Sequence, residues 1–78
     1  METDIRLDAE HTQLLHPTVE AARTAGALEL LVGMKREVFC ARMRFDSDEV
    51  DLSVFELSGL TLQELQHKLQ LAIDHVTS

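Results

Sequence analysis

The feature that most constrains this chain is a helix signal near its C-terminal end. Thr61-Leu62-Gln63-Glu64 has the T-x-x-E form of a capping box, in which the threonine oxygen accepts from the backbone of Glu64 and the glutamate side chain reaches back. Apolar side chains then recur on one stripe at helical spacing, and they are Leu62, Leu65, Leu69, Ala72, Ile73 and Val76. The pattern predicts an amphipathic helix over residues 62–76 that packs one face against the rest of the fold.

Two stretches before this helix alternate between apolar and polar side chains, which is typical of strands. They cover residues 37–45 and 50–57, and the polar sequence Asp46-Ser47-Asp48-Glu49 lies between them. Connections of this length and composition join the two strands of a hairpin. We therefore expect an antiparallel hairpin in front of the C-terminal helix.

The pairing of these strands determines which side chains share a face. With Phe45 opposite Val50, one face of the hairpin is apolar, and the other face carries Arg42 and Arg44 among polar neighbours. Further from the turn, the second face also becomes apolar, through Val38, Cys40, Phe55 and Leu57. One helix covers one face only. We therefore expect the apolar end of the second face to be an interface, covered by an N-terminal segment, a second subunit or a partner.

Residues 17–34 allow two interpretations. The segment favours a helix, but its apolar side chains fall on two opposite sides. We prefer one continuous helix that is packed on both sides. In the alternative, the helix ends near Gly26, and a third strand over about residues 28–33 turns at Gly33-Met34-Lys35-Arg36.

The first residues are also ambiguous. Ile5 and Leu7 alternate with polar residues, which is compatible with a short strand. Asp8 is equally suited to cap a helical turn that runs to Leu15, after which Pro17 would break or start a helix.

The length of 78 residues indicates a single α+β domain, with an N-terminal helical segment, an antiparallel hairpin or three-stranded sheet, and the C-terminal helix. A domain this small buries a limited core and commonly needs further stabilisation. Its one cysteine, Cys40, cannot form a disulfide within the chain, and no Cys/His cluster is present to hold zinc. We therefore expect a homodimer.

The charge of the chain restricts its partners. Fourteen acidic residues oppose seven basic ones, for a formal net charge of −7, and Trp and Tyr are absent. Binding to nucleic acid depends on clustered Lys and Arg and is helped by aromatic stacking, so a protein partner, in particular a basic one, is favoured. No apolar run is long enough to cross a membrane. The acidic residues Glu2 and Asp4 differ from the basic start of a signal peptide, and a single thiol suits a reducing cytoplasm.

The sequence contains no motif that indicates catalysis or cofactor binding. With three glycines it has no G-x-x-x-x-G-K-[ST], G-x-G-x-x-G or G-x-S-x-G, so we expect no enzyme activity, no catalytic residue and no cofactor. Residues 46–57 begin like a calcium loop, but they lack its sixth-position glycine and its twelfth-position glutamate, which is Leu57 here. We expect no metal site. The carboxylates of this turn are instead candidates for contact with a basic partner, and they are Asp46, Asp48, Glu49 and Asp51.

The passage Phe55-Glu56-Leu57-Ser58-Gly59, followed by Thr-Leu-Gln-Glu-Leu after one residue, resembles the strand-to-helix passage of HicB-type antitoxins. The likeness is confined to this passage, and the cysteine that the family carries after the glycine is missing. The resemblance implies a protein that acts by binding another protein.

Together these features predict a small acidic interaction module of the adaptor, inhibitor or antitoxin-like kind. The alternative is a nucleic-acid-binding regulator, and it would use Lys35, Arg36, Arg42 and Arg44.

Overall fold

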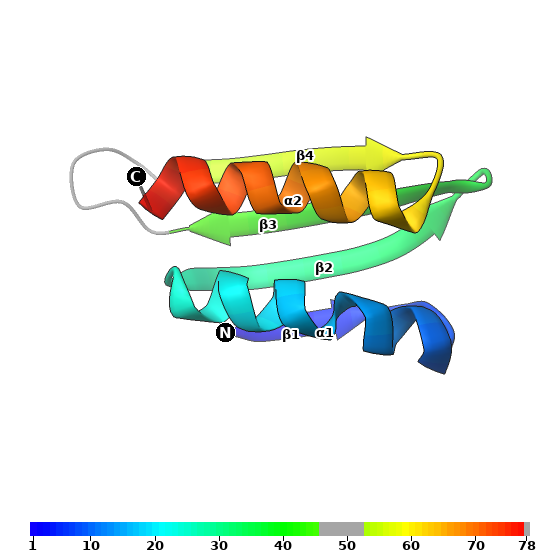
Figure 1. Cartoon of the computed structure of the whole chain (residues 1–78), viewed down its shortest axis with the longest axis horizontal. Coiled ribbons are helices and arrows are strands. Elements are labelled where there is room, and N and C mark those ends of the chain that lie inside the picture. The colour runs from blue at the N-terminus through cyan, green and yellow to red at the C-terminus, as the bar shows by residue number, and fades with distance from the viewer. Residues whose placement is uncertain (46–52, 78) are drawn as a thin grey trace.

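A computed structural model describes residues 1–45 and 53–77, which form a sheet with two helices (Figure 1). The elements are β1 (Glu2–Ile5), α1 (Ala9–Thr24), β2 (Ala27–Lys35), β3 (Val38–Phe45), β4 (Ser53–Gly59) and α2 (Leu62–Thr77). The strands lie in the order β1-β2-β3-β4; β1 is parallel to β2, and the other neighbours are antiparallel. The predicted α+β class is confirmed, with four described strands where two or three were expected.

The C-terminal helix is confirmed together with its cap. Glu64 donates its backbone N–H to Thr61 Oγ1 at 3.1 Å, and its carboxylate accepts the backbone N–H of Leu60 at 2.9 Å. The helix therefore starts where the T-x-x-E sequence predicts, and it extends to Thr77. The side chains that it buries are Leu62, Leu65, Leu69, Ala72 and Ile73.

The preferred reading of residues 17–34 as one continuous helix is wrong. Helix α1 ends at Thr24, and Gly26 has a φ of 93°, a left-handed conformation that glycine adopts without strain. The chain then continues as β2, in which Leu30 and Val32 are buried on the same face. The apolar residues before Gly26 therefore belong to a helix, and those after it belong to a strand.

Both readings of the N-terminal residues occur in succession. Residues 2–5 form β1, and Asp8 then caps α1 by accepting the backbone N–H of His11 at 2.9 Å. Pro17 neither breaks nor starts the helix, because it lies within α1 on its exposed side. Proline has no N–H, so the carbonyl of Gln13 lacks its usual helical hydrogen bond. Gln13 is an exposed residue.

The turn between β2 and β3 lies further along the chain than the predicted one. Lys35 pairs with Val38, so Arg36 and Glu37 form a two-residue turn, with φ values of 51° and 65°. Positive φ at both central residues is characteristic of the type I′ hairpin turn. Neither residue is the glycine or asparagine that such turns favour, and this is why the sequence did not indicate its position.

The predicted register of β3 and β4 is also wrong. Ala41 faces Leu57 rather than Val54, and Met43 faces Phe55. Because the shift is an odd number of residues, the side chains of β4 change faces. Phe55 and Leu57 thereby join the apolar face of β3, where the ring of Phe55 makes an edge-to-face contact with Phe45 at a centroid distance of 6.0 Å.

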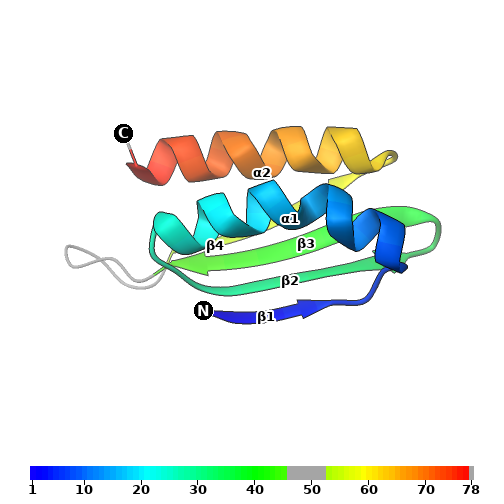
Figure 2. The ribbon, with the colours of Figure 1, turned by 60° about the horizontal axis from the view of Figure 1, so that its bottom comes forward.

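Both helices lie on the same face of the sheet (Figure 2). The side-chain amide of Gln66 in α2 donates to the backbone carbonyl of Leu14 in α1 at 2.5 Å. The core lies between this helical layer and the sheet, and its most deeply buried members are Leu15, Ala22, Leu30, Met43, Phe45, Leu65 and Leu69. The opposite face of the sheet has no described helix over it.

Candidate functional site

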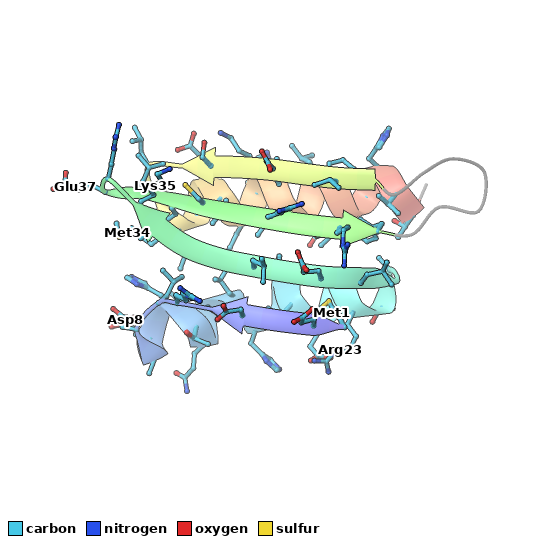
Figure 3. All side chains as sticks on the ribbon, turned by 180° about the vertical axis from the view of Figure 1, so that it is seen from behind. Met1, Asp8, Arg23, Met34, Lys35 and Glu37 are labelled. Atoms are coloured by element: carbon cyan, nitrogen blue, oxygen red, sulfur yellow. The ribbon has the colours of Figure 1, made fainter. Side chains whose placement is uncertain are left out.

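The face of the sheet that points away from the helices is the principal candidate surface, and we call it the open face (Figure 3). Its side chains follow from the strand registers and the burial pattern. They are Glu2, Asp4 and Arg6 at β1; Glu29, Leu31, Gly33 and Lys35 on β2; Val38, Cys40, Arg42 and Arg44 on β3; and Val54, Glu56 and Ser58 on β4.

The open face differs in charge from the rest of the chain. Among the described residues it holds four of the seven basic and four of the ten acidic side chains, which leaves three basic and six acidic side chains on the other described surfaces. The open face is therefore balanced in charge, whereas the other described residues carry three more acidic than basic side chains.

A groove of about 550 Å³ crosses the middle of the open face. Gly33 lies in its floor, and a Cβ atom added there would meet nothing within 4 Å. Apolar and thiol groups from Leu31 and Cys40 line it beside charged side chains. The charged groups that line it are Asp4, Arg6, Arg42 and Glu56.

The arginines of the open face are incompletely paired. Arg6 Nε lies 3.1 Å from Asp4 Oδ2, and Arg44 Nη2 lies 3.7 Å from Glu29 Oε2. Arg42 has no hydrogen bond or ion pair with the described residues, and within them the buried Nε of Arg44 lacks a hydrogen-bond partner. A guanidinium presents five N–H donors, so the exposed Arg42 retains donors for an external acceptor, whereas the buried Nε of Arg44 is not accessible to one.

The predicted apolar interface is divided by the actual register. Val38 and Cys40 lie on the open face, whereas Phe55 and Leu57 are half-buried against the core on the helical face. The expected grouping of these four side chains on one face is therefore wrong, since two of them already pack under the helices. The interface that Val38 and Cys40 were expected to form stays a prediction. The four carboxylates of the predicted acidic contact, Asp46, Asp48, Glu49 and Asp51, lie outside the described residues.

The basic residues of the alternative function are partly brought together. Lys35, Arg42 and Arg44 share the open face, and Arg36 occupies the turn beside it. Sequence reasoning missed Arg6, which joins them through the parallel pairing of β1 with β2. The spacing of Asp4 and Arg6 indicates that both side chains lie on one face of a strand. It does not indicate which other strand this strand pairs with.

No cluster within the described residues suggests metal binding. Within residues 1–45 and 53–77, no group of three or more His, Cys, Asp and Glu side chains could hold a metal ion. The half-buried Cys40 donates weakly to the carbonyl of Val38, at 3.6 Å. His11 lies at the start of α1, with its Nδ1 3.2 Å from Asp8 Oδ1 and its ring against Phe39.

Comparison with protein-family models, with curated proteins and with solved structures found no match. The resemblance to HicB-type antitoxins therefore rests on the passage from Phe55 to the start of α2 alone. Neither of the described helices combines the length and the apolar character needed to span a membrane.

Proposed function

We propose that this chain is a small protein-interaction module that acts by binding another protein through its open face. Its role would be that of an adaptor, an inhibitor or an antitoxin-like partner. The observation that supports this most directly is the groove of about 550 Å³ on a sheet face that no described helix covers. Surfaces that combine apolar contact with unsatisfied arginine donors are typical of protein interfaces.

The groove suggests how a partner would be held. A side chain of the partner fits above Gly33, beside Leu31 and Cys40, where a short residue leaves open space. A carboxylate of the partner accepts hydrogen bonds from Arg42, which forms no ion pair with the described residues although Glu56 lies opposite it on β4. A hydrogen bond to a charged group contributes about 1.5–3 kcal/mol, so each such contact would add measurably to the affinity.

Nucleic acid is the weaker candidate for this surface. Lys35, Arg42 and Arg44 supply positive charge, but the same face carries Glu29 and Glu56. Glu29 also pairs with Arg44. Phosphate groups approaching this face meet alternating charges instead of a basic patch.

A homodimer remains the assembly that we propose, since a second copy adds buried surface to a domain of 78 residues. A cytoplasmic location is part of the same proposal, because the lone thiol of Cys40 suits a reducing compartment.

The proposal is tested by comparing protein capture by four forms of the full chain: wild type, Arg42→Glu, Gly33→Gln and Arg23→Glu. The first two variants alter the open face. Arg23→Glu is the matched control, because it changes the charge equally at an exposed position of α1. Each captured protein is then purified, and its affinity for every form is measured by calorimetry.

We expect the two open-face variants to weaken binding by about tenfold or more, which corresponds to ~1.4 kcal/mol. The control should bind like the wild type. The proposal is wrong if the control loses binding while the open-face variants keep it. It is equally wrong if no protein, including a second copy of the chain, binds any form.

A further inference from the structure

We infer that the open face binds a second copy of the same chain, face to face and with the strands of the two copies antiparallel. This inference rests on the proposed function and names its partner. Two copies that each carry a charge of −7 repel one another at most orientations. The open face is where the two signs balance, so it is the surface on which two copies can approach with opposite charges in contact.

The order of residues on β2 gives a self-complementary register. Its open-face side chains run Glu29, Leu31, Gly33, Lys35. A two-fold axis that crosses the strands between Leu31 and Gly33 places Glu29 opposite Lys35 of the second copy. The same axis places Leu31 opposite the open space above Gly33 of the second copy. An acid thus meets a base, and a large side chain meets the floor of a groove.

The neighbouring strands fit the same axis. Asp4 is level with Leu31 in the sheet, and the backbone N–H of Arg6 binds the carbonyl of Val32. The axis therefore sets Asp4 opposite Arg6 of the second copy. On β3 it sets Arg42 opposite Cys40 of the second copy, diagonally from the second copy's Glu56.

The alternative two-fold axis, parallel to the strands, is unfavourable. It stacks β1 on β4 and β2 on β3 of the second copy. Asp4 then lies over Glu56 of that copy, a like-charge contact that offsets the opposite-charge contact of Glu29 with Arg44 of that copy. The antiparallel arrangement has two kinds of opposite-charge contact and no like-charge one among these residues. The sequence of charges across the sheet thus selects the antiparallel arrangement.

The area of the face predicts the strength of the dimer. Four strands spaced about 4.8 Å apart, over about 20 Å of length, give a footprint of roughly 400 Å² per copy. The total of roughly 800 Å² lies well below the size of a standard stable interface. We therefore expect a weak dimer that forms between micromolar and millimolar concentrations and loosens at high salt.

The test exchanges the charges of the pair formed by Asp4 and Arg6. Sedimentation velocity at low salt is run on the wild type, Asp4→Arg, Arg6→Asp, an equimolar mixture of these two variants, and the double variant. Both side chains are substantially exposed, at 49% and 81%, so the fold is not at risk, and circular dichroism verifies it.

Each single variant places like charges across the interface, so its dimer dissociation constant should rise about tenfold or more. The mixture should restore dimers, because the two chains are complementary to each other. The double variant should restore them as well. In the mixture, each chain still carries two like charges at positions 4 and 6 and cannot form the ion pair within itself. Recovery of dimers in the mixture therefore identifies a contact between two copies.

A wild type that stays monomeric at every concentration overturns this inference. A dimer that is indifferent to all of these variants overturns it too, because it then uses another surface. In either case the capture experiment with Arg42→Glu and Gly33→Gln still decides the proposed function, so the two failures are distinguishable.

Discussion

Gly59 and Gly33 occupy contrasting environments within the same sheet. Gly59 lies where β4 passes into α2, and a Cβ added to it would come within 2.9 Å of the backbone nitrogen of Leu65 and 3.1 Å of the carbonyl oxygen of Thr61. A side chain there would push the capped start of α2 away from the strand. Gly33 has open space above it, so its lack of a side chain shapes the groove and leaves the packing of the fold unaffected.

The pair Gly59→Ala and Gly33→Ala tests this contrast in urea unfolding. We expect Gly59→Ala to lower the free energy of unfolding by about 1–3 kcal/mol, because backbone atoms must move to admit the methyl group. Gly33→Ala should leave stability unchanged or raise it by about 0.4–1 kcal/mol, through the smaller entropy of its unfolded chain. If both variants lost the same free energy of unfolding, the close backbone contacts at Gly59 would not be the reason that this position needs glycine.

Among the elements, the hairpin of β2 and β3 is held by an unusual turn. Arg36 and Glu37 both have positive φ, a conformation that is unfavourable for side chains of this size. The register of the hairpin enforces it, since Lys35 pairs directly with Val38. The turn is therefore a place where the sequence is not optimal for the fold.

Replacing the turn by Arg36→Asn together with Glu37→Gly should stabilise the domain. Asn-Gly is the preferred pair for a type I′ turn, and we expect a gain of about 1 kcal/mol in the free energy of unfolding. Thermal and urea unfolding measure it, with the single variants as controls. A loss of stability would mean that the turn does not have the type I′ conformation.

The elements differ in how far the sequence determines them. Helix α2 was predictable because its cap and its apolar stripe are local signals. The end of α1 was not, because Ala21 and Ala25 suit a helix on either side of the boundary, and Gly26 alone marks it. The register of β4 was missed because alternation is preserved when a strand slides, and only the burial of Phe55 and Leu57 distinguishes the faces.

At the scale of the whole molecule, the open face follows from how the chain is connected. Helix α1 links the parallel strands β1 and β2, while α2 folds back from the end of β4 onto the same side (Figure 2). Arg42 and Arg44 were placed with polar neighbours from the sequence, and they are on the open face. Asp4 and Arg6 were missed as site residues, because a parallel pairing between distant segments leaves no local pattern.

The central claim is that the open face is the surface through which this protein binds, and a second copy is its simplest ligand. It is tested most directly by following backbone amide NMR signals while the protein is diluted from millimolar to micromolar concentration. We predict concentration-dependent shifts at Leu31, Gly33 and Arg42, with none at the exposed residues Gln63 and Gln70 of α2. Shifts that cluster on the helices, or a spectrum that does not change with concentration, would contradict it.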